Sequence, residues 1–275
     1  MIHQKKIALV NDITGYGRCS IAVQLPIISA LKIQACPLPT AILAVHTGFP
    51  TYYIDDYTDR MVPYIQSWKD NEVSFDGICT GFLNSVEQIG IVIDFIRDFK
   101  KEDTKVIIDP VMGDYGKLYA SYTDDLCCEM RQLLSYADVI TPNLTEACQL
   151  LGMPYPAKGS VSDRQLYEMA GRLADRGPSQ VVITGLHDGV YLDNYIYETG
   201  RDPELVKVKK IGSDRSGTGD VFTAVLAGYI VRGSSLSEAV HAAAESVSKV
   251  MIYTEKLDLP HNCGLAFEQF LTDLQ

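Results

Sequence analysis

Short apolar runs rich in β-branched residues recur along this chain of 275 residues, and segments of helical spacing separate them. The apolar runs, each long enough for one buried strand, lie at residues 7–10, 41–45, 77–79, 106–108, 139–140 and 181–184. Apolar residues recur at helical intervals within residues 86–99, 126–134 and 165–176. Strands that alternate with helices predict βαβ units, and therefore an α/β fold with a central, mostly parallel sheet flanked by helices.

The pattern changes after residue 184. Two alternating runs within residues 189–200 flank Asp193-Asn194, which predicts a β-hairpin with its turn at these two residues. Residues 206–211 also alternate, and helical segments at 217–232, 236–254 and 263–273 complete the chain. Because no linker, repeat or low-complexity segment interrupts this order, we expect a single domain over residues 1–275.

Each predicted parallel strand ends in a polar or glycine-containing stretch. Ligands bind open α/β sheets outside the carboxyl ends of the strands, where the loops that follow the strands form a crevice. We therefore expect the functional site at this edge of the sheet. The stretches are Asn11-Asp12, Thr47-Gly48, Thr80-Gly81, Asp109-Pro110, Thr141-Pro142-Asn143 and Thr184-Gly185.

The composition narrows the class of protein. The net charge of −11 disfavours general nucleic-acid binding, because such binding depends on cationic side chains that neutralise phosphates. No segment reaches the ~18 consecutive apolar residues that a membrane span needs, and residues 1–6 carry no apolar leader. The seven cysteines are odd in number and include no C-x-x-C, which favours reduced thiols in a cytoplasmic protein over a zinc site.

The stretch GTGD is followed directly by an apolar run that extends to Val231, which predicts a buried helix. A buried helix start exposes unpaired N–H groups and a partial positive charge, and a bound anion satisfies both. Gly217, Thr218 and Gly219 would then form an anion hole. Asp220, in the first turn, would act as a general base toward an attacking hydroxyl. An ordinary tight turn, with Asp220 favourably placed on the helix dipole, is the alternative.

Two acids and a second helix start suggest a metal. Asp109 and Asp114 follow a strand end, and Mg²⁺ takes one or two carboxylates together with substrate phosphates and waters. Asn143 and Glu146 are three residues apart at a predicted helix start, so they face one side and would order the water shell of the metal. In the alternative, Asp109 caps the turn before Pro110, and Asn143 and Glu146 form a capping box.

Three motifs carry a resemblance to a known superfamily. DPVMGDYG (109–116), TPNLTEA (141–147) and DRSGTGD (214–220) resemble, in this order, motifs of the ribokinase-like kinases. Together with the strand and helix pattern, the resemblance covers nearly the whole chain. It implies a central sheet with flanking helices and a small β-hairpin or flap. It also implies ATP-dependent phosphorylation of a hydroxymethyl group or a similar alcohol, with Asp220 as the catalytic base.

Within this superfamily the chain most resembles the pyridoxal (vitamin B6) kinases. VHTGF (45–49) and TGFLNS (80–85) are similar to substrate-contacting segments of that family. The resemblance implies phosphorylation of the 5′-hydroxyl of pyridoxal, pyridoxamine or pyridoxine, and it implies a homodimer. The residues that would hold the vitamer are Asn11, His46, Thr47, Phe82 and Asp220.

The same resemblance implies how ATP and its cations are bound. Thr141 and Asp109 are similar to positions near a phosphate or a monovalent cation, and the segment 113–120 would close over ATP and exclude water. No motif marks the adenine pocket, which we expect between residues 206–211 and the helix from Ser237. The ATP-binding residues would be Asp114, Tyr119, Asn143, Glu146, Thr184, Gly185, Gly217 and Gly219. The metal ligands would be Asp109, Asp114, Thr141 and Glu146.

Two other functions remain open at this point. The hydroxymethylpyrimidine kinases of thiamine synthesis share DPVM and TPN followed by Glu, but they commonly carry Cys in place of Asp220 and lack the His46-Thr47 pair. Pyridoxal kinases, however, often have Ser after the first strand, and Asn11-Asp12 is partly similar to the pyrimidine-kinase loop. The second alternative is a non-catalytic ligand-binding homologue that keeps the fold.

Overall fold

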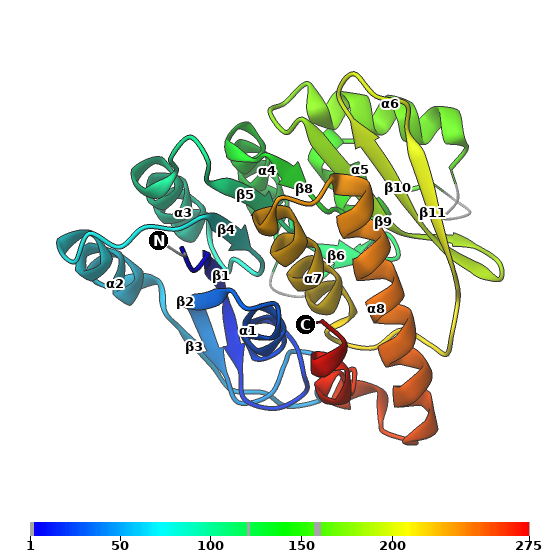
Figure 1. The fold of residues 1–275 in the computed structure, drawn as a ribbon, viewed down its shortest axis with the longest axis horizontal. Coiled ribbons are helices and arrows are strands. Elements are labelled where there is room, and N and C mark those ends of the chain that lie inside the picture. The colour runs from blue at the N-terminus through cyan, green and yellow to red at the C-terminus, as the bar shows by residue number, and fades with distance from the viewer. Residues whose placement is uncertain (1–2, 120–121, 157–160, 275) are drawn as a thin grey trace.

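The computed structural model describes residues 3–119, 122–156 and 161–274 (Figure 1). Its main sheet has nine strands in the order β11-β10-β9-β8-β5-β4-β1-β2-β3. A separate two-stranded hairpin pairs β6 Gly113–Asp114 with β7 Lys117–Leu118. The strands of the main sheet are β1 Lys6–Thr14, β2 Gln34–Leu43, β3 Ile54–Asp56, β4 Gly77–Thr80, β5 Lys105–Ile108, β8 Val139–Ile140, β9 Gln180–Asp188, β10 Tyr191–Glu198 and β11 Glu204–Lys209.

Parallel pairing dominates the main sheet. The neighbouring strands from β9 through β8, β5, β4 and β1 to β2 are all parallel. Antiparallel strands complete the two edges, with β3 beside β2 and with β10 and β11 beside β9. The prediction of an α/β fold with a mostly parallel sheet and small hairpin elements is confirmed.

Helices connect the strands and cover both faces of the sheet (Figure 1). Short 3₁₀ turns lie at η1 Leu134–Tyr136, η2 His261–Cys263 and η3 Glu268–Leu274. The α-helices are α1 Ile21–Ala30, α2 Thr58–Asp70, α3 Val86–Phe99, α4 Asp124–Leu133, α5 Leu144–Leu151, α6 Asp163–Ala174, α7 Thr218–Arg232 and α8 Leu236–Lys256.

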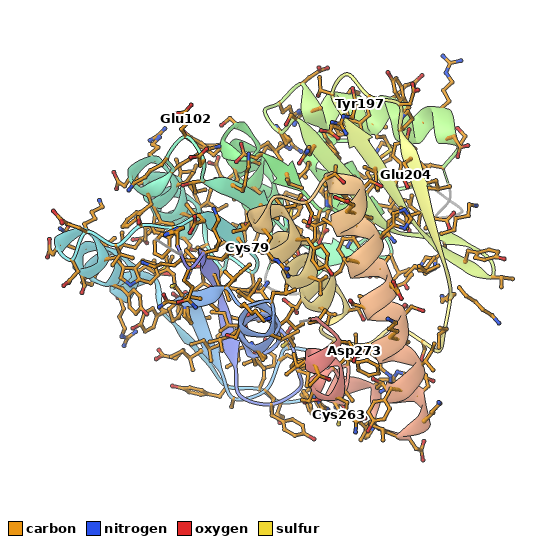
Figure 2. All side chains as sticks on the ribbon, viewed as in Figure 1. Cys79, Glu102, Tyr197, Glu204, Cys263 and Asp273 are labelled. Carbon is orange, nitrogen blue, oxygen red and sulfur yellow. The ribbon has the colours of Figure 1, made fainter. Side chains whose placement is uncertain are left out.

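Alternating strand residues divide the core into two apolar clusters, one on each face of the sheet. Val10 and Ile108 belong to the cluster that packs against helices α2 to α6. Leu9, Ile107 and the fully buried Cys79, labelled in Figure 2, belong to the cluster under α1, α7 and α8. Helix α7 contacts α1, α8, β4 and β5, so its apolar run is buried on several sides, as the sequence predicts.

The predicted hairpin turn at Asp193-Asn194 is wrong. Both residues lie inside β10 and are buried, and the turn falls instead at residues 189–190, between β9 and β10. Gly189 adopts φ +59° there, a left-handed conformation that suits glycine. The charge of Asp193 is accommodated inside the sheet because Lys207 on the neighbouring strand lies 3.3 Å from its carboxylate.

Two further elements differ from the sequence pattern. The predicted helix at 263–273 is replaced by the 3₁₀ turns η2 and η3, with Gly264 at φ +72° between them. Strand β2 begins at Gln34 rather than at residue 41, although it contains Pro37 and Pro39. Strand β3 pairs only with the end of β2, at residues 41–43, so the prolines lie where one side of the strand has no strand neighbour.

Candidate active site

A cavity of about 320 Å³ lies at the carboxyl ends of the parallel strands, where the sequence predicts a site. The walls come from the strand ends, the β6–β7 hairpin, the start of α7, and the segment after β11 with α8. Twelve of the predicted residues line it together: Asp109, Asp114, Tyr119, Thr141, Asn143, Glu146, Thr184, Gly185, Gly217, Thr218, Gly219 and Asp220. Asn11, His46, Thr47 and Phe82 do not line this cavity.

The start of α7 forms one wall of the cavity. Gly217 precedes the helix with φ +82°, and a Cβ at this position would collide with the backbone carbonyl oxygen of Arg18. The hydroxyl of Thr218 donates to the carbonyl of Arg215 at 2.8 Å and so does not cap the helix. The N–H groups of the first turn therefore lie at the cavity wall without helical partners, as an anion requires.

Gly219 differs from Gly217 in the space that surrounds its Cα. Apart from its chain neighbours and the backbone of its own helix, no described atom lies within 4 Å of the position that a Cβ at Gly219 would take, and the residue has no positive φ. The fold therefore tolerates a side chain at this position. A Cβ at residue 219 would occupy space at the helix start, so the glycine keeps the backbone there open to a ligand.

Asp220 stands in the first turn of α7 with a perturbed acidity. Burial, together with the negative charge of Asp12, raises the pKa of its carboxyl to about 6. The Nδ2 of Asn11 donates to the carboxylate at 3.4 Å and opposes that rise, as does the nearby backbone of Ser20. A carboxylate with a pKa near 6 is ionised at neutral pH and is still basic enough to accept a proton from an alcohol in a transition state.

Three further acids lie along the same cavity. Burial, followed by the charge of Asp220, raises the pKa of Asp109 to about 7, although Thr223 Oγ1 donates to Asp109 at 2.9 Å. Burial and the charge of Asp109 also raise the pKa of Glu146 well above its usual range. The carboxyl of Asp114, more exposed to solvent, has a pKa raised by burial. The negative charge of Asp220 thus raises the pKa of Asp109, and the charges of Asp109 and Asp114 raise that of Glu146. The positive charge of a bound cation would lower these pKa values.

The arrangement fits Mg²⁺ better than a metal held entirely by protein ligands. Within the described part of the chain, no three His, Cys, Asp or Glu side chains are grouped closely enough to hold a metal by themselves. Mg²⁺ usually takes only one or two carboxylates and completes its shell with phosphates and waters. The buried Oγ1 of Thr141 has no hydrogen-bond partner among the described residues, so it is free for an ion or a phosphate oxygen.

The capping box predicted as the alternative for Asn143 and Glu146 is present. The Asn143 side chain accepts the Glu146 N–H at 3.0 Å, and Glu146 accepts the Asn143 N–H at 2.8 Å. The second Glu146 oxygen accepts the N–H of Met112, and Asn143 Nδ2 donates to the carbonyl of Gly113. Both residues therefore also fix the base of the β6–β7 hairpin.

The β6–β7 hairpin contacts the opposite wall of the cavity. The hydroxyl of Tyr115 donates to the carboxylate of Asp214 and lies 3.1 Å from Nε2 of His187. The rings of Tyr115 and His187 are stacked with centroids 5.5 Å apart. Tyr119 follows the hairpin and is 44% exposed, and Ala120, the last residue of the predicted lid, lies outside the described residues.

The residues predicted to hold the alcohol substrate fall into two groups. Asn11 is buried and contacts Asp220, and its Oδ1 accepts the backbone N–H of Phe82 at 2.8 Å. His46 belongs to the second group, which contacts the C-terminal segment. Its Nδ1 accepts the N–H of Gly48 at 3.1 Å, and its Nε2 is 2.9 Å from the carbonyl of Asn262. Because Nδ1 accepts, the proton of a neutral ring is on Nε2. Thr47 is exposed.

Asn194 is a cavity residue that the sequence analysis missed. It is 3% exposed and lines the cavity together with Leu192, Val208 and, from α8, Val247 and Met251. The alternation of residues 191–198 was the available signal, because it places Leu192 and Asn194 on one face of a single strand. The sequence pattern also predicts a turn at Asp193-Asn194, and a residue in such a turn is not expected to line a buried cavity. The expected adenine region, residues 206–211 and the helix from Ser237, does contribute to the same cavity.

The cysteines do not form disulfides: all seven are free. Cys79 is in the sheet, whereas Cys263 lies in the C-terminal segment near Tyr16 (Figure 2). Among the described residues, no helix has both the length and the apolar character to cross a membrane.

The parallel sheet, the uncapped helix start at its carboxyl edge and the small hairpin over the cavity define the ribokinase-like architecture. The chain belongs to the phosphomethylpyrimidine kinase family, whose sequence profile matches residues 21–265. The resemblance to pyridoxal kinases of the ribokinase-like superfamily is confirmed by related proteins.

The chain is 30% identical over 203 residues to the pyridoxal kinase of Arabidopsis thaliana, with 70% of this chain and 63% of that protein aligned. It is 31% identical over 181 residues to the pyridoxine kinase of Bacillus subtilis, with 64% of each aligned. The chain thus spans less than two thirds of either relative. A Bacteroides thetaiotaomicron protein that carries a phosphomethylpyrimidine kinase name, solved in a crystal form with pyridoxal, is 40% identical. That comparison covers 99% of this chain and 96% of the other, with a TM-score of 0.95.

Proposed function

We propose that this protein transfers the γ-phosphoryl group of ATP to the 5′-hydroxyl of a B6 vitamer, as in vitamin B6 salvage. One observation carries the proposal: Asp220, with a pKa of about 6, stands at the uncapped start of α7 on the cavity wall. Phosphoryl transfer to an alcohol needs a base for the hydroxyl and donors for the transferring oxygens, and this helix start supplies both. The pyridoxal and pyridoxine kinase names of the relatives support the choice of acceptor.

In the proposed reaction, Asp220 accepts the proton of the 5′-hydroxyl as the hydroxyl oxygen forms a bond to the γ-phosphorus. The bond from that phosphorus to the bridging oxygen of ADP breaks, and ADP leaves with the electron pair. The N–H groups of residues 217–220 stabilise the charge on the transferring oxygens. Asn11, which contacts Asp220 and Phe82, would place the alcohol beside the base.

Asp109, Asp114 and Glu146 would hold Mg²⁺, directly or through waters, and the free hydroxyl of Thr141 would face a phosphate oxygen or a monovalent cation. Bound Mg²⁺ would neutralise charge on the β- and γ-phosphates. Thr184 and Gly185 would lie along the ribose and phosphates. The apolar wall formed by Val208, Val247 and Met251 would take the adenine, with the buried amide of Asn194 to hydrogen-bond it.

A hydroxymethylpyrimidine kinase is the second candidate function. The family profile and the name of the Bacteroides relative both favour it, and so does Asn11-Asp12 in the sequence. Asp220 and the His46-Thr47 pair favour the B6 vitamer. The third candidate is a non-catalytic homologue. In that case the carboxylates that line the cavity would have a role other than phosphorylation of an acceptor.

The test measures ADP release from Mg²⁺-ATP with pyridoxal, pyridoxamine, pyridoxine, hydroxymethylpyrimidine or no acceptor. We expect turnover with the B6 vitamers, and Asp220→Asn serves as the matched inactive control. A preference for hydroxymethylpyrimidine would establish the second candidate instead. ATP binding with no acceptor-dependent release would reject both kinase functions.

The proposal extends to the assembly and its location. By the family resemblance we propose that the protein is a homodimer and that each subunit is a single kinase domain over residues 1–275. The seven free thiols favour a reducing compartment such as the cytoplasm. Light scattering of the purified chain at micromolar concentration tests the dimer directly.

A further inference from the structure

The side-chain amide of Asn11 is hydrogen-bonded at both of its ends. The residue lies in β1 and is 1% exposed. Its Oδ1 accepts the backbone N–H of Asp12 at 2.9 Å and that of Phe82 at 2.8 Å. Its Nδ2 donates to Gln24 Oε1 at 3.2 Å and to Asp220 Oδ1 at 3.4 Å. Because a backbone N–H can only donate, these contacts fix the oxygen end of the amide and turn the nitrogen, a donor, toward the carboxylate.

Gln24 is a buried amide in α1 that the proposed reaction leaves without a role. It is 1% exposed, and its Oε1 accepts the hydrogen bond from Asn11. Its Nε2 is buried and has no hydrogen-bond partner among the described residues. A buried donor without a partner costs stability, so the Gln24 side chain is an expensive residue for the core. Within the described part of the chain, the one hydrogen bond that this side chain makes is the one to Asn11.

Gly81, directly after β4, leaves open the space that the Asn11 amide fills. A Cβ at residue 81 would lie 2.3 Å from Nδ2 of Asn11, 2.5 Å from its Cγ and 2.7 Å from its Oδ1. These are the three described atoms nearest to that position. Gly81 has no positive φ, so its backbone conformation does not itself require glycine. A side chain at this position would therefore push the amide out of its place beside Asp220.

We propose that Gln24 and Gly81 are positioning residues for the phosphoryl transfer, which hold the Asn11 amide in place so that its Nδ2 orients the catalytic carboxylate of Asp220. The proposal rests on the proposed function. Neither Gln24 nor Gly81 is among the residues that line the cavity. Displacement of the amide should therefore slow the chemical step, because the carboxylate is held less often in the geometry for proton transfer, and should leave binding of ATP and of the alcohol nearly intact.

The test is a double-mutant cycle between Gly81→Ala and Asn11→Ala, with pyridoxal and Mg²⁺-ATP as substrates. In the wild-type background the new methyl group displaces the amide, so we expect Gly81→Ala to lower kcat about 10- to 100-fold, within the range for a misoriented catalytic group. In the Asn11→Ala background the methyl group meets no amide, and the same change should lower kcat less than about threefold. An equal loss of kcat in both backgrounds, a loss confined to KM, or no loss in either background would overturn the proposal.

Two further variants separate positioning from general destabilisation. Gln24→Met keeps the length of the side chain but removes the acceptor, and it should lower kcat about 3- to 10-fold. Its Tm should change little, because the change removes the unpaired Nε2 and leaves one N–H of Asn11 unpaired in its place. Gly90→Ala, in α3, is the matched control: no described atom outside its own helix lies within 4 Å of the new Cβ, and kcat should stay within about twofold. An unchanged kcat in Gln24→Met would overturn the role of Gln24.

A crystal structure of the Gly81→Ala protein with ADP provides a readout independent of turnover. Displacement of the Asn11 amide, with a changed orientation of the Asp220 carboxylate, supports the positioning role. Retention of the contact between Nδ2 and the carboxylate overturns it, even if the wild-type protein phosphorylates no B6 vitamer, a result that would by itself reject the proposed function. If Gly81→Ala does not fold, the same contact is examined in Gln24→Met.

Discussion

The phosphate side of the site and its alcohol side differ in how far apart their contacting residues lie along the chain. We define the phosphate side as the residues proposed to bind phosphate and metal from three short motifs, namely Asp109, Thr141, Asn143, Glu146 and residues 217–220. The alcohol side comprises Asn11, His46, Thr47 and Phe82, which are proposed to hold the vitamer, with the adjoining segment 15–20. Its contacts join Asn11 to Asp220, His46 to Asn262 and Arg18 to Glu268.

This difference shows what each side depends on. The phosphate side relies mainly on groups fixed within a few residues, such as the capping box of α5 and the free N–H groups at the start of α7. The alcohol side includes contacts with the C-terminal segment, from Arg18 to the carbonyl of Cys263 and from His46 to the carbonyl of Asn262. Substitutions should therefore affect ATP handling and alcohol recognition separately, except at Asp220, where the sides meet.

The largest effect is expected at that meeting point. Asp220→Asn removes the base and should lower kcat by about 10²–10⁴-fold, the usual value of general-base catalysis. Affinity for ADP, measured by titration calorimetry, should change little because the N–H groups of the helix start remain. Turnover within about threefold of the wild type would show that Asp220 is not the base.

The two glycines of the phosphate side should respond in opposite ways. Gly219→Val places the new Cβ in open space outside the backbone of its own helix, so the protein should fold with an unchanged Tm. Its kcat should fall by about 10²–10³-fold, as when donors to a transferring group are lost. Gly217→Ala, the matched control, must accommodate both a positive φ and the Arg18 carbonyl, and should lower Tm. Normal turnover of Gly219→Val would remove the anion hole from the mechanism.

The buried acids along the cavity should make the stability of the fold depend on pH. The pKa of Asp109 is raised from 3.8 to about 7 on folding, so ionisation opposes folding, and stability falls as pH rises through that window. Asp109→Asn should therefore raise Tm by a few degrees at pH 8, and the gain should disappear near pH 4. Scanning calorimetry without Mg²⁺ or nucleotide measures this. A gain that grows toward low pH would contradict the assignment.

The smallest effect is expected on the alcohol side. His46→Ala should raise KM for pyridoxal by about 5–10-fold, the value of one aromatic contact with the ring of the vitamer, while KM for ATP stays within twofold. No hydrogen bond to the vitamer is counted, because both imidazole nitrogens are already bonded, to Gly48 and to Asn262. Glu268→Ala is the control, because it breaks the contact of Arg18 with the same C-terminal segment and leaves the ring of His46 in place. Equal changes in both variants would assign His46 a purely structural role.

Much of the phosphate side could be predicted from the sequence because its chemistry depends on local spacing. GTGD before an apolar run predicts a buried helix with a free start, and Asn143 and Glu146 of TPNLTEA form the capping box that their spacing predicts. Asn194 could not be found in this way, since an Asp-Asn pair between alternating runs is also typical of a turn. The positive φ of Ser20 carries no sequence signal, because the residue types near it do not require that conformation.

The sequence by itself determined the parallel α/β order, the position of the phosphate-side motifs at strand ends and the candidate base. Period-two and helical patterns and helix-start chemistry act over a few residues, so they can be read from the chain. Only the tertiary structure decided the pKa of Asp220, because burial and the charge of Asp12 set it. The tertiary structure also decided that the C-terminal segment packs on His46, because residues some 200 positions apart come together only in the folded chain.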